Sequence, residues 1–431
     1  MSKILLKNVD YLTMTQPTVE HGDILIDGTQ IRALGEVPMD LLAGGDVEII
    51  DGSHTLAMPG LVNTHNHAAM TLLRSYADDM ELMPWLTERI WPAEAKMSDE
   101  HIYWGSLLAM AEMIASGTTT FADMYSSMDH VAQAAAEIGI RADLSRGCIK
   151  DTDHDDNSIR ENKDLFDKWH GQADGRIHVR FGPHAPYTCP PDYMTKIVET
   201  AQDCQAGLHV HVAETQDELR QIREGYGKTP VEYLNDLGVF ERPTLAAHCV
   251  HLTEQDMDIL AQRGVSVAHC PVSNMKLASG TAPVPQLLAK NITVGLGTDG
   301  ASSNNSMNLM RDLSVCSFLH KLNSMDPTAL DAYDILRMAT IGGAKALGWD
   351  QEIGTLEIGK KADVILINLE ALHYYPHNNI ISDMVYSSQG ADVKTTIING
   401  QIIMRDRRFT KLDLDKVKAE MSQAARAITQ N

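Results

Sequence analysis

Two histidines, His65 and His67, stand two positions apart at the end of the apolar stretch LVNTHNH, residues 61–67. In a β-strand, residues two apart point to the same side of the sheet, whereas on a helix they would diverge. Two imidazoles that share a face at a strand end can bind one metal ion. The alternative is a pair of hydrogen-bonded histidines in the protein core.

Similar polar residues recur at the ends of other short apolar stretches. The residues are His184, His211, His248, His269 and Asp299, and Glu214 follows His211 by three positions. Solubility alone does not explain so many strand ends with His or Asp. Three imidazoles and one carboxylate suit a first-row transition metal such as zinc or iron. For His269, a place in the pocket wall and a structural role remain equally open, and Asp299 in GTDG is alternatively a simple turn residue.

The elements that position these residues alternate between short strands and helices. We expect strands at residues 61–67, 118–125, 140–147, 177–184, 207–215, 244–251, 265–271 and 292–299, with helices between them such as 101–117 and 191–207. Such alternation implies parallel strands, and eight units predict an α/β protein with a (β/α)₈ barrel. The carboxyl ends of all eight strands then meet at one mouth, where barrel enzymes place their chemistry.

Both ends of the chain read as short strands joined by Asn-Gly and Asp-Gly turns, which are typical of hairpins. Neither end is large enough to form a good sandwich alone. We therefore predict that residues 1–58 and 352–431 combine into one small β-sandwich domain, with a C-terminal helix in the second part. The catalytic barrel would span residues 59–351.

Composition narrows the class of protein. The chain has 431 residues, of which 44% are hydrophobic and 22% charged, as in ordinary globular proteins. Its formal net charge of −22 argues against a nucleic-acid partner and against an anionic membrane surface. We expect neither a signal peptide nor a membrane-spanning stretch from its apolar pattern, and the six scattered cysteines fit reduced thiols. We therefore expect a cytoplasmic protein.

At these residues the chain resembles the amidohydrolase superfamily. The motifs that carry the resemblance are PGLVNTHNH, HVHVAET, AAHCVH, GTDG and GTLEIGKKADVILIN, and they extend over nearly the whole chain. A strand-end lysine suited to bridging two metals is absent, as in the mononuclear branch. The resemblance implies one divalent metal ion per subunit, with zinc as the expected metal and iron or manganese as alternatives. The ligands it implies are His65, His67, His211 and Asp299.

A narrower set of motifs is similar to the 5-methylthioadenosine/S-adenosylhomocysteine deaminase family. These are LLRSYADDMELMPWLTERIWPAE, GPHAPYTC, PVSNMKLASG and TDGASSNNSMNLMRDL. The resemblance implies that Glu94, in WPAE, contacts the ribose hydroxyls of a nucleoside. It also implies that Arg146 and His184 line the substrate site. The acidic stretch DTDHDDN, residues 151–157, departs from the pattern near Arg146 and leaves the order of the two substrates open.

The activity that this resemblance implies is hydrolytic deamination of an adenine ring. Asp299 would accept a proton from the attacking water, His248 would orient that water, and Glu214 would protonate the ring nitrogen. Glu214 and Asp299 would therefore also contact the substrate, a small purine nucleoside. The family further implies a homo-oligomer.

Two other functions stay open from the sequence. Related amidohydrolases act on guanine, pterin or triazine rings, whose substrates carry no ribose for Glu94 to bind. A barrel retained as a structural protein is the second alternative, because one fold serves many functions.

Overall fold

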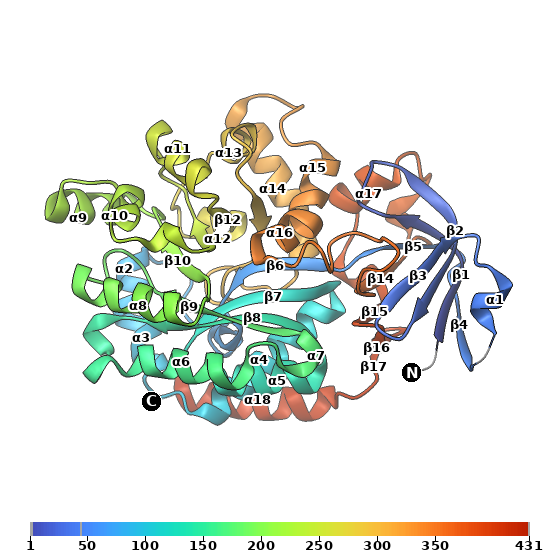
Figure 1. Cartoon of the computed structure of the whole chain (residues 1–431), viewed down its shortest axis with the longest axis horizontal. Coiled ribbons are helices and arrows are strands. Elements are labelled where there is room, and N and C mark those ends of the chain that lie inside the picture. The colour runs from blue at the N-terminus through green and yellow to red at the C-terminus, as the bar shows by residue number, and fades with distance from the viewer. Residues whose placement is uncertain (1–2, 44, 430–431) are drawn as a thin grey trace.

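The computed structural model describes residues 3–43 and 45–429, which two β-sheets organise (Figure 1). One sheet has eight strands paired in the order of the sequence, and the other has nine strands drawn from both ends of the chain. The predicted fold class, an α/β barrel with a composite β-domain, is confirmed.

Every neighbouring pair of strands in the eight-stranded sheet is parallel. Its strands are β6 (Leu61–Asn66), β7 (Thr118–Tyr125), β8 (Arg141–Cys148), β9 (Ile177–Pro183), β10 (Leu208–Val212), β11 (Thr244–His248), β12 (Ser266–His269) and β13 (Val294–Leu296). All eight strands expected from the sequence are present. Strands β10 to β13 end two or three residues earlier than expected, because the chain turns out of the sheet into the loops of the barrel mouth.

Strand β13 lies beside β6, and hydrogen bonds outside the regular ladder join these two ends of the sheet. The backbone N–H of Asp299 donates to the carbonyl of His65 at 2.9 Å. The backbone N–H of Thr298 donates to Asn63 Oδ1 at 3.0 Å, and the Asn63 amide donates back to Thr298 Oγ1 at 2.8 Å. This seam brings His65 and Asp299, more than two hundred residues apart, to one place.

Helices cover the outside of the barrel, so strands such as β6 and β7 are buried along their whole length. They include α4 (Asp99–Ala115), α5 (Met128–Ile138), α6 (Asn157–Trp169), α8 (Pro191–Asp203), α9 (Gln216–Tyr226), α11 (Glu254–Arg263), α13 (Val284–Ala289) and α14 (Leu309–Ser324). The side chains of Ser98 and Thr253 accept backbone hydrogen bonds at the starts of α4 and α11, which satisfies otherwise free N–H groups. Among residues 3–43 and 45–429, no helix has both the length and the apolar character of a membrane span.

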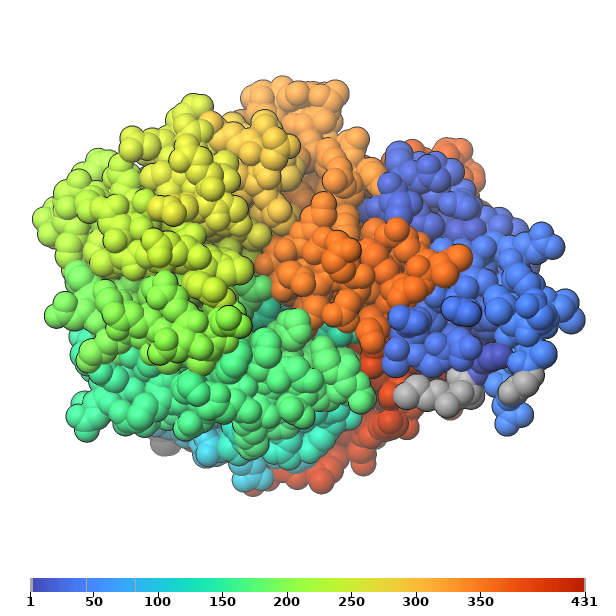
Figure 2. All heavy atoms as spheres, viewed as in Figure 1, coloured from blue at the N-terminus to red at the C-terminus, as the bar shows by residue number. Residues whose placement is uncertain are grey.

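The nine-stranded sheet joins the two ends of the chain. Its strands are β1 (Lys3–Leu12), β2 (Val19–Asp27), β3 (Gln30–Gly35), β4 (Val47–Asp51), β5 (Thr55–Pro59), β14 (Val364–Asn368), β15 (Val393–Ile398), β16 (Gln401–Arg405) and β17 (Arg408–Phe409). Strand β14 pairs antiparallel with β5, and Leu6, Val9, Ile24 and Leu366 share one buried core. In the space-filling view, the N-terminal strands (blue) pack directly against the later segment drawn in orange (Figure 2).

The two sheets meet at Gly60, the single residue between β5 and β6. A side-chain carbon at Gly60 would lie 2.1 Å from Thr119 Oγ1, so only glycine fits this crossing. Nearby, Arg141 at the start of β8 and Asp363 form a buried ion pair, with Arg141 Nε 3.1 Å from Asp363 Oδ2. The domain boundaries at 58/59 and 351/352 stay a prediction.

The chain continues after β17 into helix α18 (Leu414–Thr429), which packs against α4 of the barrel (Figure 1). Its buried side chains are Val417, Met421, Ala424 and Ile428. Because these recur at three- or four-residue spacing, they form one apolar stripe along the helix.

Candidate active site and metal centre

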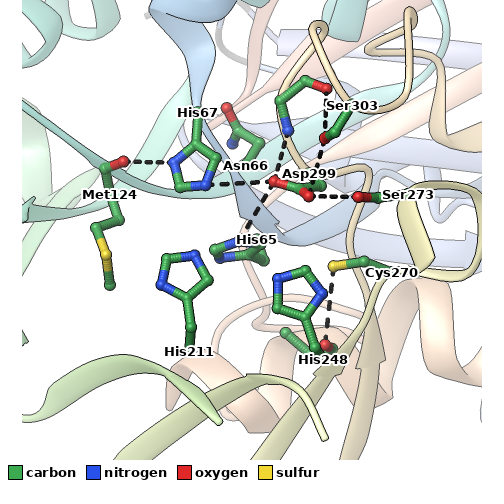
Figure 3. Close-up of polar contacts among 12 residues, drawn as sticks. His65, Asn66, His67, Met124, His211, His248, Cys270, Ser273, Asp299 and Ser303 are labelled. Atoms are coloured by element: carbon green, nitrogen blue, oxygen red, sulfur yellow. Dashed lines mark hydrogen bonds and ion pairs between the residues drawn. The ribbon is translucent and has the colours of Figure 1, made fainter. Parts of the chain in front are cut away.

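The four residues implied as metal ligands converge at the carboxyl mouth of the barrel and point toward one another (Figure 3). One ring nitrogen from each of His65, His67 and His211 lies within 4.8 Å of the others. Asp299 Oδ1 lies 3.6 Å from His65 Nε2 and 3.3 Å from His67 Nε2. Ligand atoms around a tetrahedral zinc, with bonds of about 2.0–2.2 Å, are roughly 3.3–3.6 Å apart. The arrangement therefore fits one divalent ion.

Backbone carbonyls fix the protonation of two of these imidazoles. His67 Nδ1 lies 2.6 Å from the carbonyl oxygen of Met124, and His211 Nδ1 lies 2.7 Å from that of His184. A carbonyl only accepts hydrogen bonds, so each Nδ1 carries the proton and each Nε2 keeps its lone pair. A metal ligand needs such a lone pair, and partners of this kind orient it.

A chain of buried hydrogen bonds orients His65. The Ser145 hydroxyl donates to the Asp123 carbonyl at 3.0 Å, so its oxygen can accept from His209 Nδ1 at 3.3 Å. His209 Nε2 then accepts from His65 Nδ1 at 2.8 Å. Within the described part of the chain, the remaining nitrogen, His65 Nε2, is buried and has no hydrogen-bond partner. The lone pair of His65 Nε2 is therefore available to bind a metal ion.

The Asp299 carboxylate is held from two sides. Its Oδ2 accepts from the hydroxyls of Ser273 at 2.6 Å and Ser303 at 2.9 Å, and its Oδ1 accepts from the Gly300 N–H at 2.7 Å. Burial alone would raise the pKa of Asp299, but the neighbouring imidazoles, His65 foremost, lower it well below its usual range. The carboxylate is therefore ionised, with Oδ1 directed at the histidines.

Glu214 and His248 lie together beside the proposed ligands. Glu214 Oε2 is 3.8 Å from His248 Nε2, and the His248 ring stacks on that of His211 with centroids 5.5 Å apart. His248 Nδ1 lies 2.9 Å from Asn274 Oδ1, which leaves Nε2 facing the mouth. Burial raises the pKa of Glu214 and so favours its acid form. The pair can exchange protons with a bound molecule.

Four non-glycine residues at these strand ends have left-handed backbone. The φ angles are 51° at Ala213, 72° at His248, 49° at Cys249 and 61° at Asp299. Such residues cost about 1–3 kcal/mol each and cluster where a site demands them. They turn the chain sharply after β10, β11 and β13.

Two of the residues implied as substrate contacts lie next to this centre. Glu94, in α3 (Trp91–Glu94), accepts a hydrogen bond from Tyr125, whose ring centroid lies 6.3 Å from that of His67. Burial raises the pKa of Glu94 to about 7, although the Tyr125 hydrogen bond lowers it. The ring centroid of His184 lies 4.8 Å from that of His211, and burial lowers the pKa of His184 to about 3. His184 is therefore neutral near pH 7.

Arg146, the third implied contact, is paired with helix α6. Its Nε donates to Glu161 Oε2 at 2.6 Å, and its backbone N–H donates to Asn162 Oδ1 at 3.0 Å. The preceding residue, Ser145, bonds His209 inside the barrel, so alternation along the strand directs Arg146 outward. Its contact with substrate stays a prediction.

Comparison with known proteins identifies the family of this barrel. The model of the amidohydrolase family matches residues 56–403. The chain belongs to the amidohydrolase family. The 5-methylthioadenosine/S-adenosylhomocysteine deaminase of Pelotomaculum thermopropionicum is 52% identical over 430 residues, covering 99% of this chain and 98% of that protein. The resemblance noted in the sequence is thereby confirmed.

Two solved structures resemble this amidohydrolase over nearly its whole length. A zinc-bound adenosine deaminase from Xanthomonas campestris is 33% identical with a TM-score of 0.94, covering 100% of this chain and 99% of that one. Atrazine chlorohydrolase from Arthrobacter aurescens TC1, complexed with zinc, is 26% identical with a TM-score of 0.89, covering 98% and 100%. Family, neighbours and the histidine cluster together support a divalent metal in this amidohydrolase.

Several partners of the site residues escaped the sequence analysis. Tyr125, the partner of Glu94, ends β7, so the strand-end rule applied to the other strands would have found it. Ser273 and Asn274 lie in α12 (Pro271–Lys276), the short helix after β12, and hold Asp299 and His248. Their roles depend on where the short helix after β12 lies relative to the barrel mouth, and the spacing of residues in the sequence does not predict that position.

His269, whose role the sequence left open, has a partner on α14. His269 Nε2 lies 3.0 Å from His320 Nε2, and Cys316 lies close to both. Two nitrogens bound to one tetrahedral zinc would be about 3.3 Å apart. The shorter distance is that of a hydrogen bond, so we read this buried group as a packing contact between β12 and α14.

Proposed function

We propose that this amidohydrolase hydrolyses the amino group from C6 of the adenine ring in 5′-methylthioadenosine, S-adenosylhomocysteine or both, releasing ammonia and the inosyl product. Adenosine is a further candidate substrate. The observation that carries the proposal is the convergence of Glu214, His248 and Asp299 on one histidine cluster. The names of the relatives support it. We further propose one zinc ion per subunit; a homo-oligomer and a cytoplasmic location stay predictions.

The chemistry divides between the metal and the protein. A divalent ion held by the four proposed ligands would supply a Lewis acid that brings the pKa of water to about 7. Asp299 accepts the proton of the attacking water, because its ionised carboxylate lies beside the histidine cluster. His248 Nε2 orients that water.

Glu214 makes the ring carbon reactive. Aromatic C6 is a poor electrophile until the adjacent ring nitrogen is protonated, and a buried, protonated glutamic acid is the donor that this step needs. Glu214 is suited to this step because burial raises its pKa and so favours its acid form. Asp299 then passes the proton that it took from water to the amine, the hydroxyl on C6 returns its proton to Glu214, and ammonia leaves.

The ribose is the proposed partner of Glu94. A carboxylate can accept both hydrogen bonds of a vicinal diol. Tyr125 donates to Oε1 and so holds the carboxylate while Oε2 stays available.

We expect Glu94→Gln to raise KM for 5′-methylthioadenosine by about 10–100-fold with a smaller change in kcat, because a hydrogen bond to a charged group contributes about 1.5–3 kcal/mol. In the wild type, KM should also rise as the pH falls through about 7, since protonated Glu94 loses acceptor capacity. Steady-state kinetics across neutral pH measure both effects, with the exposed Glu88→Gln as the control. A variant with normal KM would remove Glu94 from ribose binding.

Whether Arg146 helps to select between the two substrates can be tested through its partner Glu161. S-adenosylhomocysteine carries a carboxylate tail that 5′-methylthioadenosine lacks, and Glu161 already neutralises Arg146. We expect Glu161→Gln to improve kcat/KM for S-adenosylhomocysteine relative to 5′-methylthioadenosine by about 2–5-fold, the small scale of a partly exposed ion pair. Asp164→Asn, which alters an exposed carboxylate of the same helix, is the control. An equal change for both substrates would contradict this role.

A substrate panel tests the proposal as a whole. Ammonia release is measured with 5′-methylthioadenosine, S-adenosylhomocysteine, adenosine, guanine and a chlorotriazine. The alternative from the sequence, action on another amino- or chloro-substituted heterocycle, has support in the atrazine chlorohydrolase structure. Turnover of guanine or the triazine but not of the nucleosides would favour that alternative.

A further inference from the structure

A second buried glutamate holds the loop that carries Glu214. Glu218 lies in the first turn of α9 and is only 2% exposed. Its Oε1 accepts from the backbone N–H of Ala213 at 2.8 Å, and its Oε2 accepts from the backbone N–H of Glu214 at 2.9 Å. One carboxylate therefore binds two consecutive peptide groups, one of them that of the proposed acid.

The backbone at this point needs such support. Ala213 has a φ of 51°, a left-handed conformation that a residue with a Cβ rarely adopts. From the other side, its carbonyl accepts from the N–H groups of Val250 at 3.1 Å and His251 at 2.9 Å. These two residues follow His248, so the loops that carry Glu214 and His248 are held to each other and to α9.

Only a carboxylate in this position satisfies both peptide groups. Glu218 is itself fixed, because its N–H donates to Thr215 Oγ1 at 3.2 Å at the start of α9. A helix start also favours a negative charge. Glutamine has one acceptor and one donor at its tip, so one of the two N–H groups would face an N–H₂ group instead of an oxygen.

We propose that Glu218 is a positioning residue that sets the backbone of Ala213 and Glu214 and thereby aims the Glu214 carboxyl at the substrate ring. This inference rests on the proposed deamination. It assigns Glu218 no contact with substrate or metal. Its loss should therefore affect kcat through Glu214 and leave KM and metal binding nearly unchanged.

The test is a double-mutant cycle with Glu218→Gln and Glu214→Gln. We expect Glu218→Gln alone to lower kcat by about 10–100-fold while the protein stays folded and keeps the wild-type zinc content at the assay temperature, since a small misplacement of a catalytic group has effects of this size. In the Glu214→Gln background it should cause no further loss, because two residues that act as one unit are not additive. The matched control is Glu232→Gln on α10 (Pro230–Asp236). The half-buried carboxylate of Glu232 caps the start of that helix by accepting the backbone N–H of Thr229 at 2.9 Å.

Three results would overturn the proposal. These are an unchanged kcat, a loss that merely follows lost zinc or lost folded protein, and an equal further loss in the Glu214→Gln background. Should Glu218→Gln fail to fold, Glu218→Asp replaces it in the same cycle, because its shorter side chain cannot reach both N–H groups. A wild type that deaminates no nucleoside would instead refute the proposed function, and this inference with it.

Discussion

Glu214→Gln is expected to lower kcat for deamination by about 10²–10⁴-fold, the usual contribution of a general acid. Glutamine matches glutamate in size but has no proton to give to the ring nitrogen. The side chain is buried, and its Oε2 lies 3.8 Å from His248 Nε2, so water cannot easily replace it. Ammonia release with 5′-methylthioadenosine measures the rate.

Metal analysis of the same sample completes the Glu214 experiment. The variant should keep the wild-type metal content, because the proposed ligands are His65, His67, His211 and Asp299. Glu224→Gln, an exposed change on helix α9, which follows the loop that carries Glu214, should behave as the wild type. Normal deamination by Glu214→Gln would remove this residue from the mechanism.

Asp299→Asn should have an effect of similar size, about 10²–10⁴-fold in kcat even when zinc is supplied in excess. The change removes the negative charge and the oxygen that would accept the proton of water, while the hydroxyls of Ser273 and Ser303 still have a partner in the amide oxygen. Rates are compared at equal zinc content, so that weak metal binding is not mistaken for lost chemistry.

Ser303→Ala provides the matched comparison for Asp299. It removes one of two hydroxyl donors to Oδ2 and leaves Oδ1 unchanged, so we expect a loss of about tenfold or less, the scale of one hydrogen bond. Zinc-loaded Asp299→Asn that is as active as Ser303→Ala would contradict the role of Asp299 as proton acceptor.

The convergence of the site could be predicted because it depends on simple geometry. His65 and His67 share a face through the two-residue period of a strand, and parallel strands bring Asp299 to the same mouth. Because the strands pair in the order of the sequence, closing the barrel places β13 next to β6.

The limits of sequence reasoning lie in the loops. Strands β10 and β11 end early at Val212 and His248, and the non-glycine residues Ala213 and His248 take left-handed backbone that no local pattern predicts. Arg146 was assigned to the site from a motif alone, and its orientation depends on Ser145 facing His209. Glu218 was not singled out from the sequence, because only the fold reveals its two backbone contacts.

Hydrolysis at C6 is the central step of the proposed mechanism, and one measurement tests it directly. Zinc-loaded protein is incubated with 5′-methylthioadenosine in ¹⁸O-labelled water, and the product is analysed by mass spectrometry. The proposed mechanism predicts an inosyl product with a single labelled oxygen on the purine ring and one ammonia released per product. Unchanged nucleoside, free adenine, or an inosyl product without the label would contradict it.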